Sequence, residues 1–130
     1  MKALPVILLS WLLLAGCGRD RGERKDETPV KRAPDAVARE VFNQNCTTCH
    51  GVSGRGDGPA AASLQPRPRD YTDPIWQSGT TDDQIRKVIL EGGAAVGKSP
   101  AMMAWGKLPE LQDPAVVDAL VHIIRGFAKQ

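Results

Sequence analysis

The chain has 130 residues, enough for one small domain and too few for two ordinary ones. Its 17 lysines and arginines nearly balance 15 aspartates and glutamates, so the formal charge of +2 gives no electrostatic footprint for nucleic acid. The 13 glycines and 10 prolines indicate a fold rich in loops, and the odd number of cysteines, 3, argues against a domain held only by disulfides. Composition therefore excludes a large enzyme core and gives no sign of a nucleic-acid partner.

The first segment has the pattern of an export signal. Lys2 precedes an apolar run over residues 3–15, which is shorter than the roughly 18 to 20 residues that span a bilayer as a helix. The sequence that ends it, Leu-Ala-Gly-Cys, resembles the lipobox of bacterial lipoproteins, in which the cysteine is lipidated. We therefore expect a lipoprotein signal peptide over residues 1–16 and a lipid anchor on Cys17, on the periplasmic side of a bacterial membrane. A plain signal peptide or an uncleaved signal anchor is the alternative.

A charged segment follows the expected anchor. From Gly18 to Pro34, ten of seventeen residues are charged, with both signs mixed and no aromatic residue. Such a segment cannot bury enough apolar surface to offset its ordering entropy. We therefore expect residues 17–34 to be the lipidated cysteine with a flexible tether, and residues 35–130 to form the folded domain.

Three helices are predicted in this domain, and no strand pattern occurs. The first begins at Asp35 and runs to the cysteines. The second begins at Thr81, where Gln84 completes a capping box, and the third begins at Pro114 after an aspartate. Their expected buried faces are Val37, Val41 and Phe42; Ile85, Val88 and Ile89; and Val117, Leu120, Val121 and Ile124.

A long coil separates the first two predicted helices. Residues 51–80 contain five glycines and four prolines, and a connection of about thirty residues is unusual inside a compact domain. Three short helices also offer too little apolar area to stabilise a domain of this size. We therefore expect a large planar cofactor to fill the interior, with the coil wrapped around it.

Residues 46–50, Cys-Thr-Thr-Cys-His, form a C-x-x-C-H motif, which is the attachment signature of c-type haem. Cys46 and Cys49 lie near one helix face and can form thioethers with two vinyl groups, while His50 faces the iron as the proximal ligand. A redox disulfide and half of a zinc site are the alternatives. The zinc site lacks a second ligand pair, since only His122 remains elsewhere, and the disulfide leaves His50 and the long coil unexplained.

With this motif in place, the domain resembles a class I, single-haem cytochrome c of the bacterial periplasmic kind. The resemblance implies an all-α cytochrome c fold, with three main helices and long loops wrapped around one covalently attached haem c and its iron. It is carried, besides the motif, by Ala38 and Phe42, by residues 54–59 (Gly-Arg-Gly-Asp-Gly-Pro), by residues 91–93 (Glu-Gly-Gly) and by residues 99–106 (Ser-Pro-Ala-Met-Met-Ala-Trp-Gly).

The last of these segments supplies the distal iron ligand in the family, which commonly has Met-Pro-Ala-Trp there with the methionine as ligand. Met102 aligns with that methionine, and Met103 replaces the proline. We therefore expect Met102 to bind the iron, with Met103 as the alternative. Without the stiffening proline, we expect this loop to release its sulfur more readily than in most relatives.

Further site residues follow from the same resemblance. Pro59 matches the family residue whose carbonyl accepts a hydrogen bond from the other nitrogen of the ligand histidine. Tyr71, Trp76 and Arg69 are candidates for the pocket of the haem propionates, because buried tyrosine and tryptophan seek polar partners. His122 lies in the terminal helix, which in this family packs away from the distal side, so we expect a surface or packing role for it.

The resemblance implies an electron carrier rather than an enzyme. It would pass one electron to and from other redox proteins of a respiratory chain at the periplasmic membrane surface, through a haem with His and Met ligands. A haem-based gas-binding or sensor module with a labile methionine is the alternative, and an interaction module with a structural haem is a third class.

Overall fold

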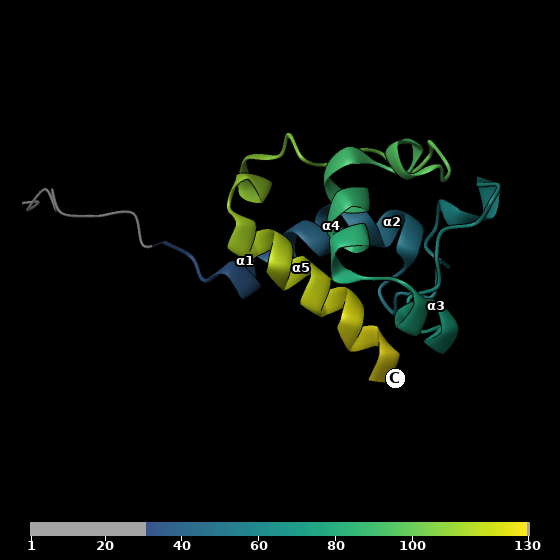
Figure 1. Cartoon of the computed structure of the whole chain (residues 1–130), viewed down its shortest axis with the longest axis horizontal. Helices are drawn as coiled ribbons and strands as arrows, with labels where there is room; N and C mark the ends of the chain where they lie inside the picture. The colour runs from purple at the N-terminus through teal and green to yellow at the C-terminus, as the bar shows by residue number, and fades with distance from the viewer. Residues whose placement is uncertain (1–30, 130) are drawn as a thin grey trace, which may run out of the picture. The chain divides into compact units, whose positions relative to one another are not determined.

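The computed structural model describes residues 31–129, and in this range it is helical, without any strand. The expected signal peptide, Cys17 and most of the expected tether lie outside the described residues. Between residues 31 and 129, none of the helices has the length and apolar character needed to cross a membrane. The elements, shown in Figure 1, are α1 (Pro34–Val41), the π-helical turn η1 (Phe42–Cys46), α2 (Thr47–His50), η2 (Ala61–Ser63), α3 (Pro74–Gly79), α4 (Asp82–Glu91), η3 (Ala94–Val96), η4 (Pro109–Gln112), α5 (Pro114–Gly126) and η5 (Phe127–Lys129).

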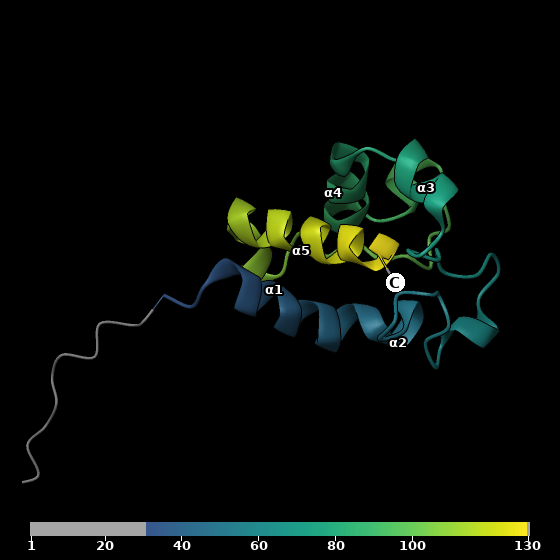
Figure 2. The ribbon, with the colours of Figure 1, turned by 90° about the horizontal axis from the view of Figure 1, so that it is seen from below.

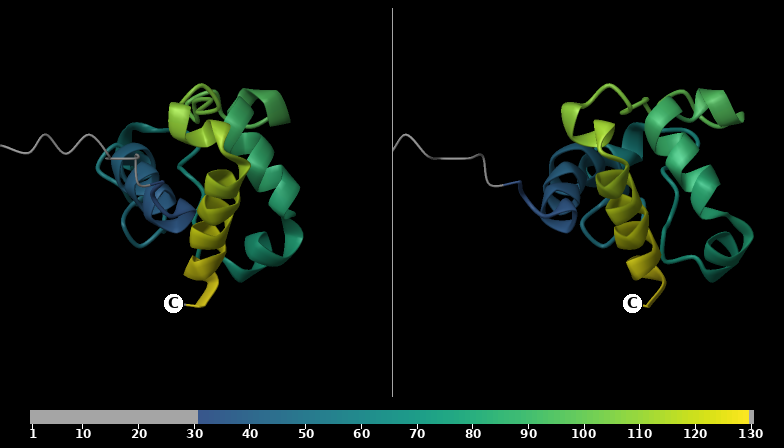
Figure 3. Two further views of the ribbon diagram at one scale, coloured as in Figure 1. Left: turned by 90° about the vertical axis from the view of Figure 1, so that its left-hand side faces the viewer. Right: turned by 60° about the vertical axis from the view of Figure 1, so that its left-hand side comes forward.

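The packing of α1 against α5 forms the centre of the core. Figure 2 shows α5 lying over the continuous segment of α1, η1 and α2, and Figure 3 shows α5 between α1 and α4. Ala38 has no exposed surface, so its small side chain allows the two helices to approach closely. The buried residues of these elements are Val37, Ala38, Val41 and Phe42, then Val116, Val117, Ala119, Leu120, Val121 and Ile124.

The N-terminal signals of the second and third predicted helices are confirmed. The Thr81 hydroxyl accepts a hydrogen bond from the Gln84 amide at 3.2 Å, and the Gln84 side chain accepts one from the Thr81 amide at 2.8 Å. This capping box begins α4. The Asp113 carboxylate accepts a hydrogen bond from the Ala115 amide at 3.0 Å, and Pro114 is the first residue of α5.

The first predicted helix differs from a regular α-helix where it approaches the motif. The amide of Thr47 donates to the carbonyl of Phe42, five residues back, so η1 is a π-helical turn. Within this wide turn the side chain of Asn45 also donates, from Nδ2, to the Val41 carbonyl at 3.1 Å. The motif therefore begins on a turn that contains one residue more than a regular helix would have.

The long coil also contains a helix that the sequence analysis did not predict. α3 begins with Asp73, whose carboxylate accepts hydrogen bonds from the amides of Ile75 and Trp76, followed by Pro74 at the first helical position. This is the same Asp-Pro signal that begins α5. At six residues, α3 carries too little apolar periodicity to stand out from a coil rich in glycine and proline.

Candidate cofactor site

The two cysteines of the motif lie on adjoining helical turns. Cys46 is the last residue of η1 and Cys49 lies in α2, and both are half-buried, free thiols. Burial raises the pKa of Cys46 to about 11, and the nearby Cys49 adds to the effect. A redox-active Cys-X-X-Cys pair needs a lowered thiol pKa, so this environment argues against the redox disulfide.

His50 ends α2 and is buried. Its Nδ1 lies 3.2 Å from the carbonyl oxygen of Arg69. Because a carbonyl oxygen only accepts, Nδ1 carries the proton of the neutral ring, and Nε2 is left with a lone pair. Burial lowers the pKa of His50, against a smaller raising effect of the Arg69 carbonyl, so the neutral ring is favoured. His50 is thus held in the tautomer that can bind a metal through Nε2.

The loop after the motif folds back on the end of α2. The amides of Gly56, Gly58 and Ala60 donate to the carbonyls of the last three motif residues, with distances of 2.9, 3.1 and 2.9 Å. A side chain at Gly58 would collide with this backbone, because its Cβ would lie 2.4 Å from the carbonyl oxygen of Thr47. The loop therefore satisfies the carbonyls at the helix end and fixes the direction of His50.

The acceptor for His50 differs from the expectation. The family resemblance implies the carbonyl of Pro59, whereas in this structure Nδ1 of His50 faces the carbonyl of Arg69. Pro59 is exposed in the loop beside the motif. The Arg69 carbonyl was not identified from the sequence because a backbone acceptor carries no side-chain signature, and its place depends on the path of the whole coil. The role of Pro59 toward a bound cofactor stays a prediction.

Of the three propionate candidates, two join His50 in an aromatic cluster. Tyr71 is buried and stacks on His50, with ring centroids 4.4 Å apart and planes at 13°, and its hydroxyl lies 3.0 Å from Nε2. Trp76 is half-buried, 5.3 Å from the Tyr71 ring. Burial raises the pKa of Tyr71.

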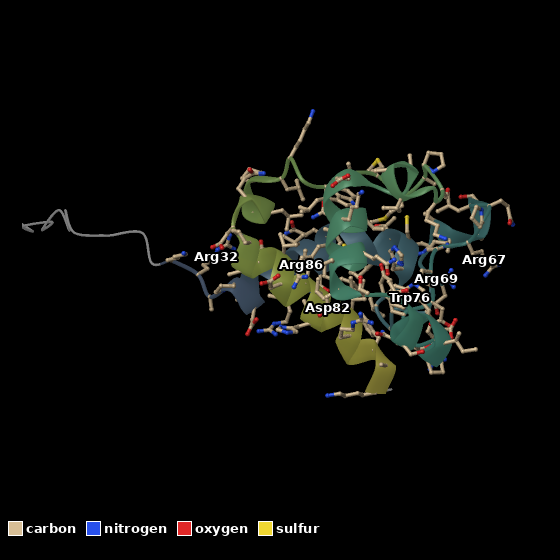
Figure 4. All side chains as sticks on the ribbon, in the orientation of Figure 1. Arg32, Arg67, Arg69, Trp76, Asp82 and Arg86 are labelled. Carbon is tan, nitrogen blue, oxygen red and sulfur yellow. The ribbon has the colours of Figure 1, made fainter. Side chains whose placement is uncertain are left out.

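The guanidinium of Arg69 is exposed and lies 4.0 Å from Asp73, near Trp76 in Figure 4. Arg69 thus contacts His50 through its backbone.

The end of α4 positions the segment that holds the two methionines. The amide of Gly93 donates to the Met102 carbonyl at 2.8 Å, and the Trp105 amide donates to the Ile89 carbonyl at 2.9 Å. Met102 is half-buried, whereas the side chain of Met103 is 57% exposed. The packing therefore favours Met102 over Met103 as a ligand, and its binding to iron stays a prediction.

The donors of this site fit a haem better than they fit the zinc alternative. Over residues 31–129, no group of three or more His, Cys, Asp or Glu side chains is placed to hold a metal ion alone. His122 is exposed on α5 and is not part of the site. Two free thiols and a histidine whose Nδ1 faces a carbonyl match the covalent attachment and proximal ligation of haem, and the Tyr71 hydroxyl at 3.0 Å from Nε2 would have to give way to the iron.

A helical domain with this motif at the end of its first helical segment defines a c-type cytochrome. Residues 33–123 match the family model described as cytochrome C oxidase, cbb3-type, subunit III. The chain belongs to this family.

Individual relatives agree with this assignment. The cbb3-type cytochrome c oxidase subunit FixP of Bradyrhizobium diazoefficiens is 32% identical over 103 residues, covering 75% of this chain and 30% of the relative. FixP of Azorhizobium caulinodans is 34% identical over 90 residues, covering 67% of this chain and 26% of the relative. A solved structure, the KustC0563 c-type cytochrome, matches with a TM-score of 0.50 at 34% identity, covering 69% of this chain and 95% of that chain. The chain thus spans about a third of the length of the curated relatives it matches.

The close contact at Gly93 gives the first prediction. A Cβ there would lie 2.2 Å from the Ser99 carbonyl and 3.2 Å from the Met102 Cβ, so Gly93→Ala must push the methionine segment away. We expect a loss of about 1–3 kcal/mol in the free energy of unfolding, measured by chemical denaturation. Gly126→Ala is the control, because open space surrounds Gly126 near the end of α5, and a gain of up to about 1 kcal/mol is expected. Equal stability of the two variants would contradict the contact.

Proposed function

We propose that this chain is a haem c electron carrier. Cys46 and Cys49 attach the haem, His50 is the proximal iron ligand and Met102 is the distal ligand. One observation carries the proposal: the buried His50 is held by the Arg69 carbonyl as the neutral tautomer, directly after two free thiols. When bound, the haem supplies a one-electron redox change at its iron.

The roles of the residues follow from their chemistry. Each cysteine thiol would add across a vinyl group of the haem, forming a sulfur–carbon bond while the thiol hydrogen passes to the neighbouring carbon. His50 donates the Nε2 lone pair, and the hydrogen bond at Nδ1 keeps its ring oriented and basic. A thioether ligand from Met102 favours the reduced iron and raises the potential relative to harder donors. With His50 and Met102 both bound to the iron, the site would transfer electrons without converting a substrate.

The family supports the setting of this activity. The relatives are named as subunits of cbb3-type cytochrome c oxidases, so we propose that the partners are redox proteins of a respiratory chain. A lipid on Cys17 would hold the domain at the periplasmic face of a bacterial membrane without a spanning helix. The chain would then be a carrier, or a component of a redox enzyme complex, rather than an enzyme by itself.

Haem attachment is tested by producing the chain in a host with haem-maturation machinery. We expect a coloured product whose mass is increased by one haem, with neither Cys46 nor Cys49 open to alkylation. Replacing both cysteines by serine should abolish the covalent haem. A folded, colourless wild-type product with two reactive thiols would contradict the proposal.

The identity of the distal ligand is tested by two alanine variants. Met102→Ala should lower the reduction potential by more than about 59 mV, a tenfold change in a one-electron equilibrium. It should also let the reduced iron bind carbon monoxide. Met103→Ala, the matched control, should do neither, and the reverse result would assign the ligand to Met103.

Carbon monoxide binding also separates the carrier from the alternative function, a gas sensor. Met103 at the position of the family's proline favours the sensor, because a loop without that proline is less stiff. A wild-type spectrum that carbon monoxide leaves unchanged supports the carrier. Ready uptake of the gas by the wild-type protein supports the sensor.

The lipid anchor is tested by Cys17→Ser. This variant should leave the membrane fraction and appear in the soluble periplasmic fraction, with its haem content unchanged, because the proposed haem ligands and attachment sites are other residues. Fractionation and mass spectrometry measure both properties. Persistent membrane binding of this variant would exclude lipidation as the anchor.

A further inference from the structure

We infer that Asp70 is a positioning residue for the proximal histidine, because its carboxylate fixes the turn that presents the Arg69 carbonyl to Nδ1 of His50. The inference rests on the proposed function, since it concerns how that iron ligand is held. Asp70 is half-buried in the coil before α3 and directly follows Arg69. The Arg69 carbonyl belongs to the planar peptide unit between the two residues, so its direction depends on the backbone conformation of Asp70.

The side chain of Asp70 closes a turn on the backbone that follows it. Its Oδ1 accepts hydrogen bonds from the amide and from the hydroxyl of Thr72, both at 2.7 Å. An aspartate that binds the amide two residues on forms an Asx turn, which restricts the backbone between the two residues. The middle residue of this turn is Tyr71, whose amide donates to the Gly54 carbonyl at 2.7 Å. The segment after Arg69 is thus fixed by a side chain and by a backbone hydrogen bond.

Gly56 confines the same segment from the opposite side. Its amide donates to the His50 carbonyl at 2.9 Å, so it lies beside the end of α2. A Cβ at Gly56 would lie 2.3 Å from the carbonyl oxygen of Pro68 and 3.3 Å from that of Arg69. Only a residue without a side chain permits this approach. The Arg69 carbonyl is therefore enclosed between the loop after the motif and the turn at Asp70.

These contacts are compatible with bound iron. The iron would take Nε2 of His50, whereas the Arg69 carbonyl faces Nδ1, at 3.2 Å. The Tyr71 hydroxyl can leave Nε2 without breaking any bond of the turn, because the turn holds the backbone of Tyr71. A hydrogen bond from Nδ1 makes the ligand more basic, and a more basic ligand stabilises oxidised iron. Loosening the turn weakens this hydrogen bond, so the reduction potential should rise.

The test compares Asp70→Ala with Asp70→Asn in the haem-loaded full chain. Both variants remove the same negative charge, but only asparagine keeps a side-chain oxygen that can accept from Thr72. At a fixed ambient potential, we expect the ratio of reduced to oxidised protein to be about threefold higher in Asp70→Ala than in Asp70→Asn. This corresponds to about 28 mV at 59 mV per tenfold change. Equal ratios in the two variants would overturn the inference.

The sign of the shift separates positioning from a merely structural role. A coil that only opened to water would stabilise the oxidised, more positive iron, so the ratio in Asp70→Ala would fall below that in Asp70→Asn and overturn the inference. Hydrogen exchange at Nδ1 of His50, followed by NMR on the same samples, is the second readout. It should be faster in Asp70→Ala, and equal exchange rates would also overturn the inference. Failure of the proposed function would appear instead as colourless wild-type protein.

Asp113→Ala is the matched control. The Asp113 carboxylate also accepts from the amide two residues on, that of Ala115, at 3.0 Å. It lies at the start of α5 and 3.5 Å from Lys31, and Figure 2 shows this end of α5 far along the helical segment from α2. This variant should lose stability without a shift of the potential. A shift as large as that of Asp70→Ala would show that any loosened turn has this effect, and would overturn the inference.

Thr72→Val replaces Asp70→Ala should the alanine variant accumulate too poorly to measure. Valine has nearly the shape of threonine and leaves the charge of Asp70 in place, but it removes the hydroxyl that donates to Oδ1. We expect the ratio of reduced to oxidised protein to rise about 1.7-fold over wild type, half of the shift in potential, because the bond from the amide remains. An unchanged ratio would overturn the inference.

Discussion

The hydrogen bond between Nδ1 of His50 and the carbonyl of Arg69 is the contact on which the site depends. It determines which ring nitrogen keeps its proton, and so which one can bind a metal. A carbonyl can reach the ring only because the coil after α2 first covers the end of that helix and then returns beside it. The coil between α2 and α3 thus places one acceptor and the aromatic residues that follow it.

The helices provide the fixed frame for this coil. α1 and α5 bury their apolar faces against each other, and α4 ends at the glycine pair whose backbone holds the Met102 segment. The motif is continuous with α1, and the methionine segment is hydrogen-bonded to α4. Both expected iron ligands are therefore attached to elements packed on α5, which keeps them in place.

Much of this architecture could be predicted from the sequence, because its signals are local. The capping box at Thr81, the Asp-Pro pair before α5 and the spacing of the motif each involve residues within five positions. The features that were missed depend on distant segments. The Arg69 carbonyl reaches His50 across nineteen positions, and Gln77 reaches Ile124 across forty-seven, and neither contact leaves a periodic pattern. α3 carried a usable signal, its own Asp-Pro start, within a region whose glycines and prolines indicated coil.

The π-helical turn η1 has a consequence for how the chain can vary. Each residue of a regular helix advances about 100° around the axis, so the extra residue in this turn re-aims everything that follows it relative to the apolar stripe of α1. The two cysteines therefore do not continue the regular helical spacing of the apolar stripe on α1, which changes at Phe42. Deleting one residue between Phe42 and Cys46 would turn the bond from the Thr47 amide to the Phe42 carbonyl into that of an ordinary helical turn, so both sulfurs would keep nearly the same direction relative to α5.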